Sequence, residues 1–112
     1  MRVPVPAHPF LRELGCITVG WEGDRQVLRL AGDIDTDAVL AFEQSGMSDG
    51  RVITVVDLTE VTFLSSTGVA FVIRQTQPAR NQGHLPVLRG LTHSARRILQ
   101  LTGTSALFHT VS

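Results

Sequence analysis

The chain has 112 residues, a length typical of one domain, with ten arginines, no lysine, ten acidic residues and one cysteine. The single Cys16 excludes an internal disulfide and a cysteine-rich zinc site, and the formal net charge of zero argues against a general nucleic-acid-binding protein. The charge is nevertheless divided: residues 1–60 hold five arginines and ten acids, whereas residues 61–112 hold five arginines and no acid. Net charges of −5 and +5 on the two halves indicate oppositely charged surfaces.

The N-terminal residues lack the features of a signal peptide. Pro4, Pro6 and Pro9 interrupt the stretch where such a peptide needs continuous apolar residues, and they also disfavour a helix or a central strand. No apolar run in the chain is long enough to span a bilayer. We therefore expect a cytoplasmic protein without membrane insertion, with an N-terminal arm over residues 1–14 and a single domain over residues 15–112.

The first regular structure is predicted to be a β-hairpin. Residues 16–21 and 27–31 both alternate apolar with polar or small residues, which is typical of strands. Gly23 and Asp24 between them are turn-forming residues.

Three alternating aspartates, Asp33, Asp35 and Asp37, follow the hairpin. They are good N-cap candidates for a short helix that begins near Ala38. In an extended conformation the three carboxylates would lie on one side of the chain and could bind a cation. The glycine and the distal glutamate of an EF-hand calcium loop are, however, not found at the required positions. Capping is the interpretation that we favour.

Residues 52–58 are β-branched and almost all apolar, which predicts a strand buried on both faces of a parallel sheet. Phe63 and Leu64 are expected to pack inward after it. The hydroxyl residues 65–67 then open a second helix, and Pro78 predicts that this helix kinks or ends near residues 75–77.

The C-terminal part continues the alternation of strands and helices. A short strand is predicted over 85–89, a helix over 95–101 capped by Thr92 or Ser94, and a last strand over 107–111. The helix is expected to turn three residues to the core: Ile98, Leu99 and Leu101. The whole pattern predicts an α/β domain with a mainly parallel sheet of four to five strands, about three helices and an antiparallel N-terminal strand.

Enzymatic motifs are absent from the sequence. It contains no phosphate-binding GxxxxGK[ST], no dinucleotide-binding GxGxxG and no nucleophile motif GxSxG, and its four histidines lack metal-ligand spacing. We therefore predict no catalytic residue, no metal site and no cofactor.

The segment Val61-Thr62-Phe63-Leu64-Ser65-Ser66-Thr67-Gly68 resembles the pattern V-x-F-[ML]-D-S-[ST]-G of the STAS domains, in particular the bacterial anti-sigma factor antagonists. The resemblance extends over residues 16–110. It includes Gly32-Asp33-Ile34-Asp35 after the second strand, and Leu88-Arg89-Gly90 followed by residues 96–103 near the end of the chain.

The resemblance implies a non-catalytic regulator of transcription. Such an antagonist binds an anti-sigma factor that is also a serine kinase, which releases the sigma factor. The kinase then phosphorylates one serine, the complex dissociates, and a phosphatase resets it. By position the phosphoacceptor is Ser66, with Ser65 and Thr67 as second choices. Ser65 stands where the family usually has aspartate.

The resemblance and the predicted topology together suggest a partner-binding surface. Loops 32–37, 58–66 and 89–95 follow parallel strands and therefore meet at one edge of the sheet. We expect the acidic loop on one side of Ser66 and a basic group, Arg89, His93, Arg96 and Arg97, on the other. The expected partner-binding residues are Asp33, Asp35, Ser65, Ser66, Thr67, Gly68, Arg96 and Arg97.

Two alternatives remain at this stage. In the first, the hydroxyl residues serve only to cap a helix, because free N–H groups in a first turn need such acceptors. The domain is alternatively a STAS subunit of a membrane transport complex, or another interaction module that is never phosphorylated.

Overall fold

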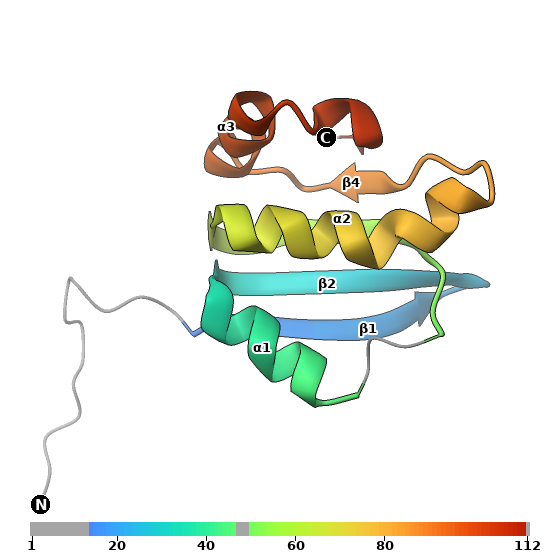
Figure 1. Ribbon diagram of the computed structural model, residues 1–112, viewed down its shortest axis with the longest axis horizontal. Coiled ribbons are helices and arrows are strands. Elements are labelled where there is room, and N and C mark those ends of the chain that lie inside the picture. The colour runs from blue at the N-terminus through green and yellow to red at the C-terminus, as the bar shows by residue number, and fades with distance from the viewer. Residues whose placement is uncertain (1–13, 47–49, 112) are drawn as a thin grey trace, which may run out of the picture.

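The computed structural model describes residues 14–46 and 50–111 (Figure 1). The elements in chain order are β1 (Cys16–Glu22), β2 (Arg25–Ile34), α1 (Thr36–Gln44), β3 (Ile53–Leu64), α2 (Ser66–Asn81), β4 (Val87–Arg89), α3 (His93–Thr102), the 3₁₀ helix η1 (Ser105–Leu107) and β5 (His109–Val111). The predicted N-terminal arm lies outside the described residues except for Leu14, whose side chain is exposed.

The strands form one sheet in the order β1-β2-β3-β4-β5. β1 is antiparallel to β2, and all later neighbours are parallel. The predicted α/β fold is therefore confirmed, including its antiparallel N-terminal strand. Because β2, β3 and β4 run in the same direction, α1, α2 and α3 all begin at the same end of the sheet (Figure 1).

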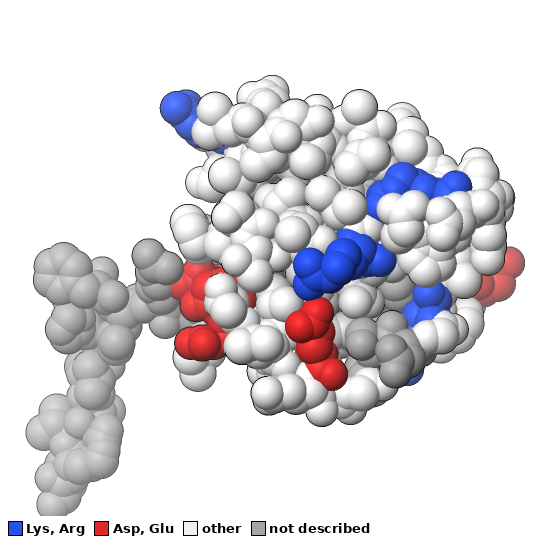
Figure 2. Space-filling model, viewed as in Figure 1, with Lys and Arg blue, Asp and Glu red and all other residues white. Residues whose placement is uncertain are grey.

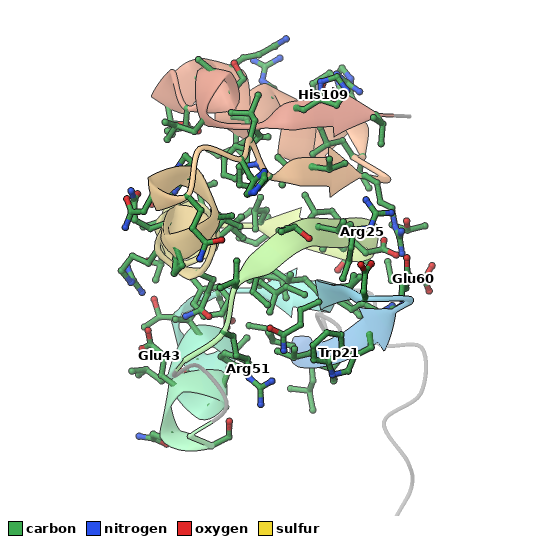
Figure 3. All side chains as sticks on the ribbon, turned by 90° about the vertical axis from the view of Figure 1, so that its right-hand side faces the viewer. Trp21, Arg25, Glu43, Arg51, Glu60 and His109 are labelled. Carbon is green, nitrogen blue, oxygen red and sulfur yellow. The ribbon has the colours of Figure 1, made fainter. Side chains whose placement is uncertain are left out.

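The three helices pack on one face of the sheet, as the two perpendicular views show (Figures 1 and 3). The hydrophobic core lies between these helices and the sheet. It contains Leu28, Leu30, Ile34, Val39, Phe42, Ile53, Val56, Leu58, Val61, Leu64, Val69, Phe71, Val72, Leu88, Ala95, Leu99 and Phe108. Residues 53–58, which were predicted to be buried on both faces, are buried or half-buried throughout, although the helices cover only one face. Val27 and Val55 are buried on the opposite face, where the strands also carry charged side chains at alternating positions.

β3 is longer than predicted and continues to Leu64. Successive side chains of a strand point to opposite faces. Leu64 is therefore buried, whereas Phe63 is 42% exposed, and the expectation that both pack inward is wrong for Phe63.

α2 continues past Pro78 to Asn81, so the predicted end near residues 75–77 is wrong. Side chains of the same helix bind carbonyls of the turn before the proline. The Arg80 guanidinium donates to the Ile73 carbonyl at 2.5 Å, and the Thr76 hydroxyl donates to the Val72 carbonyl at 2.7 Å. The carbonyl that loses its N–H partner to the proline is that of Arg74, four residues earlier, so these bonds reinforce the neighbouring turn and do not replace the missing bond.

α3 begins after one of the two caps that the sequence indicated, and it is longer at both ends than predicted. Thr92 is its N-cap, and Gly103 ends it in the left-handed conformation, with φ of 70°. Leu99 is buried, but Leu101 is 71% exposed, so its predicted core position is wrong. At 100° per residue, Leu101 lies about 200° around the helix from Leu99 and points away from the sheet. Within the part of the chain that the structure describes, no helix has the length and apolarity needed to cross a membrane.

Candidate functional site

The start of α2 is attached to the end of β2 through Ser65. The Ser65 hydroxyl accepts a hydrogen bond from the Gly68 N–H at 3.0 Å and donates one to the Ile34 carbonyl at 2.9 Å. The Ser65 N–H donates to the same carbonyl at 3.1 Å. Ser65 is thus both the N-cap of the helix and the link between the helix and the neighbouring strand.

Gly68 allows the helix to approach β2 closely. A Cβ at this position would lie 2.8 Å from the Leu64 Cδ1 atom, and 3.0 Å from both the Ile34 Cγ2 atom and the Ile34 carbonyl oxygen. A larger residue therefore cannot enter without displacing its neighbours. The glycine of the quoted motif has a packing role in this chain.

Ser66 is the accessible hydroxyl of the group. It is the first residue of α2, it is exposed, and its hydroxyl makes no hydrogen bond with any described residue. Ser65 is held by the two bonds above, and the Thr67 hydroxyl lies 3.4 Å from that of Thr36. The first turn of a helix has free N–H groups and a positive dipole end, which stabilise a negative group such as a phosphate.

The acidic loop lies beside this helix start, as the topology predicted. Asp35 caps α1, with its carboxylate accepting from the Ala38 N–H at 3.0 Å, and Asp37 lies exposed in the first turn. Asp33 is buried. Figure 2 shows acidic side chains gathered where α1 begins. The capping interpretation is confirmed for Asp35, and the described residues contain no group of three or more histidine, cysteine or acidic side chains placed to hold a metal ion.

The basic side of the predicted surface is only partly formed. Arg96 and Arg97 are exposed in the first half of α3, at the same end of the sheet as α2 begins. Neither guanidinium makes an ion pair with a described residue, and neither is hydrogen-bonded to Ser66.

Arg89 does not belong to this surface. Its side chain alternates with that of the buried Leu88 and therefore lies on the face of the sheet that has no helices. The Arg89 guanidinium donates to the Asp57 carboxylate at 3.1 and 3.2 Å and to the Glu22 carboxylate at 2.8 Å. Arg29 pairs with Glu22 at 2.5 Å. The hydrogen bond with Glu22 is the main cause that raises the pKa of Arg89, so this cation is engaged in holding the strands together.

Two features of the site could not be recognised in the sequence. The Ile34 carbonyl, which receives both bonds from Ser65, and Thr36, which contacts Thr67, come from a segment about thirty residues earlier in the chain. Neither a backbone acceptor nor a single threonine has a sequence signal. Only the parallel pairing of β2 with β3, which ends at Ile34 and Leu64, places them there.

Comparison with protein families finds a match that covers most of the chain. A family model described as "Mlab, STAS domain" matches residues 17–109. No curated protein sequence is significantly similar to the chain.

Several solved structures share the fold. An anti-sigma factor antagonist from Mycobacterium paratuberculosis superposes with a TM-score of 0.70 and 23% sequence identity, over 87% of this chain and 85% of that one. The anti-sigma factor antagonist SpoIIAA in its unphosphorylated form gives 0.65 and 18%, over 87% and 89% of the two chains. The phosphorylated form of SpoIIAA, described as a Bacillus cell fate determinant, gives 0.58 and 18%, over 87% and 92%.

Proposed function

The chain belongs to the STAS domain family, and on that basis we propose that it is an anti-sigma factor antagonist whose partner binding is switched off by phosphorylation of Ser66. The observation that carries the proposal is the state of the three adjacent hydroxyls. Two of them have hydrogen-bond partners, and the third, Ser66, is exposed at the first position of a 16-residue helix.

A phosphate on Ser66 is compatible with the fold. It would lie at the positive end of the α2 dipole, where negative charge is stabilised, and it would replace no hydrogen bond of the protein. The domain would keep its structure while its surface gained about two negative charges. A partner that docks around the helix start would then meet a changed charge, which is the requirement for a binding switch.

The replacement of the usual aspartate by Ser65 is consistent with this role. A serine hydroxyl still caps α2, and it also donates to the Ile34 carbonyl, which an ionised carboxylate cannot do. The change removes one negative charge beside Ser66. The helix start therefore keeps its geometry. Because less negative charge surrounds Ser66 before the modification, a phosphate changes the local charge by a larger proportion.

The proposed partner is an anti-sigma factor that is also a serine kinase, with a phosphatase that reverses the modification. The anti-sigma factor would bind this chain in the cytoplasm, and the binding would require no cofactor. The proposed contact residues are Asp35, Ser65, Ser66, Thr67, Arg96 and Arg97. Asp33 and Gly68, which the sequence also indicated as contacts, are buried and would act on the partner only by shaping the two loops. Arg96 and Arg97 are exposed where the helix dipole disfavours cations, so we assign them to an acidic group of the partner or to the phosphate on Ser66.

The test begins with phosphorylation. The protein is incubated with its partner kinase and ATP, and the phosphate is mapped by mass spectrometry in the parent chain and in the variants Ser66→Ala, Ser65→Ala and Thr67→Ala. We expect the modification on Ser66 and its loss in the Ser66→Ala variant alone. A phosphate that persists in that variant would move the acceptor to another hydroxyl.

A pull-down measures the switch itself. We expect Ser66→Ala to retain the partner and Ser66→Asp to lose it, whereas Ser94→Asp, at an exposed position in the first turn of α3, should retain it. Equal binding of the two Ser66 variants, together with no phosphorylation by the true partner, would contradict the switch. That result would favour a non-phosphorylated module such as a STAS subunit of a membrane transport complex.

A further inference from the structure

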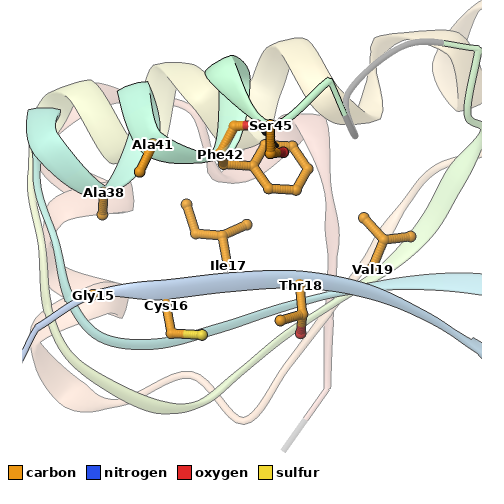
Figure 4. A pocket seen from close by; sticks show the side chains of 9 residues that line it. All are labelled: Gly15, Cys16, Ile17, Thr18, Val19, Ala38, Ala41, Phe42 and Ser45. Carbon is orange, nitrogen blue, oxygen red and sulfur yellow. Dashed lines mark hydrogen bonds between the residues drawn. The ribbon is translucent and has the colours of Figure 1, made fainter.

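A groove runs between β1 and α1. It has a volume of about 500 Å³ and is lined by Gly15, Cys16, Ile17, Thr18, Val19, Ala38, Ala41, Phe42 and Ser45. Figure 4 shows Ile17 and Val19 pointing from the strand toward the helix, with Ala41 and Phe42 opposite them. Its walls are therefore largely apolar, although it is open to solvent.

The strand that forms one wall is an edge of the sheet. β2 is the single neighbour of β1 among the described strands, so β1 has a row of backbone N–H and C=O groups on its outer side. Residues 16–22 contain no proline, and Glu22 at the end of the strand is their one charged residue, so little in the sequence protects this edge. An extended segment of another protein can add to such an edge by backbone hydrogen bonds, with alternate side chains in the adjacent groove.

The groove continues into an acidic end. A second hollow of about 300 Å³ shares Gly15, Ala38 and Ala41 with it and is further lined by Leu14, Asp33, Asp35 and Asp37. Neither Asp35 nor Asp37 makes an ion pair with a described residue, and Figure 2 shows acidic side chains at this end of the molecule. One continuous groove therefore has apolar walls along β1 and negative charge at its end.

We propose that this groove binds an extended segment of a protein partner, which adds a strand to β1 and carries small apolar side chains followed by an arginine or lysine. The apolar side chains lie against Ile17, Val19 and Phe42. The cationic group lies beside Asp35 and Asp37, where the charges are complementary. The seven residues of β1 span about 23 Å at 3.3 Å per residue, so the segment has a similar length.

The proposal is tested with two synthetic peptides of alternating valine and threonine. One carries two arginines at its N-terminus, and the other carries them at its C-terminus. Binding to the full chain is followed by amide chemical shifts and by hydrogen exchange. We expect one of the two peptides to shift the signals of β1 and of the α1 residues facing it, and to slow exchange of alternate β1 amides. A peptide that ends in two glutamates should not bind.

Matched variants locate the site. Ala41→Gln places a polar side chain in the groove and should weaken binding about tenfold, whereas Leu40→Gln, at an exposed neighbouring residue that does not line the groove, should leave binding unchanged. Asp37→Asn should weaken it by about threefold, as expected for an exposed charge pair. Amide spectra of the free variants confirm that each is folded.

The result of the peptide-binding experiment can be distinguished from the result of the experiments on Ser66. Ser66→Asp should bind the peptide as the parent chain does, whatever its effect on the anti-sigma factor. Equal binding of the arginine and glutamate peptides, no effect of Ala41→Gln, or no binding of either arginine peptide would overturn the proposal. Protection of β1 amides that rises with protein concentration in the absence of peptide would also overturn it, because a second copy of the chain would then occupy the groove.

Discussion

The starts of α2 and α3 are built alike but are connected differently to the sheet. In each, a hydroxyl N-cap accepts a hydrogen bond from the N–H three residues later: Ser65 from Gly68 at 3.0 Å, and Thr92 from Ala95 at 3.1 Å. The Ser65 hydroxyl has a second bond, to the Ile34 carbonyl of β2, and Thr92 has no equivalent.

The third position of the two helices shows the same contrast. In α3 it is Ala95, whose methyl group is fully buried, whereas in α2 it is Gly68, where a methyl group would lie within 3.0 Å of Ile34 and Leu64. A hydroxyl cap alone therefore does not distinguish the proposed regulatory helix start from an ordinary one. What distinguishes α2 is its tight attachment to β2, which leaves the exposed Ser66 on a rigid support.

The largest expected effect on stability comes from removing the two caps. Ser65→Ala should lower the free energy of unfolding by about 2 kcal/mol, because the helix loses its cap and the Ile34 carbonyl loses one of its two donors. Thr92→Ala should cost about 1 kcal/mol, the usual effect of a lost cap. Chemical denaturation measures both, and equal losses would contradict the proposed attachment of α2 to β2.

Exchanging the residues at the third position should destabilise both helices for opposite reasons. Gly68→Ala should cost about 1 kcal/mol, because crowding against Ile34 and Leu64 exceeds the gain in helix propensity. Ala95→Gly should cost about 1–2 kcal/mol, since it removes a buried methyl group and adds backbone freedom. Thermal unfolding tests this, and a stabilised Gly68→Ala variant would show that the contacts relax without cost.

A negative charge in the first turn should stabilise the domain slightly. Ser66→Asp should raise the free energy of unfolding by about 0.3–1 kcal/mol through its interaction with the helix dipole. Ser94→Asp should give a similar gain in α3. If Ser66→Asp loses partner binding while its stability rises, the binding loss is not due to unfolding. A clear drop in its melting temperature would contradict the claim that the fold accommodates a phosphate.

The smallest effect is expected for the contact between the two threonines. The Thr67 and Thr36 hydroxyls are 3.4 Å apart, a long distance for such a bond. Thr67→Val should therefore change the stability by less than about 0.5 kcal/mol. A larger loss by denaturation would mean that this contact contributes substantially to the attachment of α2.

Much of the fold follows from local sequence. The two N-terminal strands and the order of strands and helices depend on neighbouring residues and were predicted correctly. The caps Asp35 and Thr92 were among the candidates that the sequence offered for each helix. The motif around Ser66 was likewise apparent. The predictions of which side chains are buried were wrong where a residue's environment depends on distant parts of the chain.

Tertiary structure alone decided the remaining features. Phe63 and Leu101 have the same apolar character as their buried neighbours, and only the direction of the strand and of the helix face exposes them. Arg89 was expected beside Ser66 because both follow parallel strands, but the alternation of β4 turns it toward Asp57 and Glu22 on the opposite face.

The sequence by itself determined the α/β order, the helix caps and the position of the hydroxyl motif, since each results from interactions within a few residues. It did not determine which hydroxyl is free, because that depends on the Ile34 carbonyl and on Thr36, brought from about thirty residues away by the pairing of β2 with β3. The groove beside β1 has the same origin: its walls come from separate elements, and only their packing leaves Ile17 and Ala41 on either side of an open space.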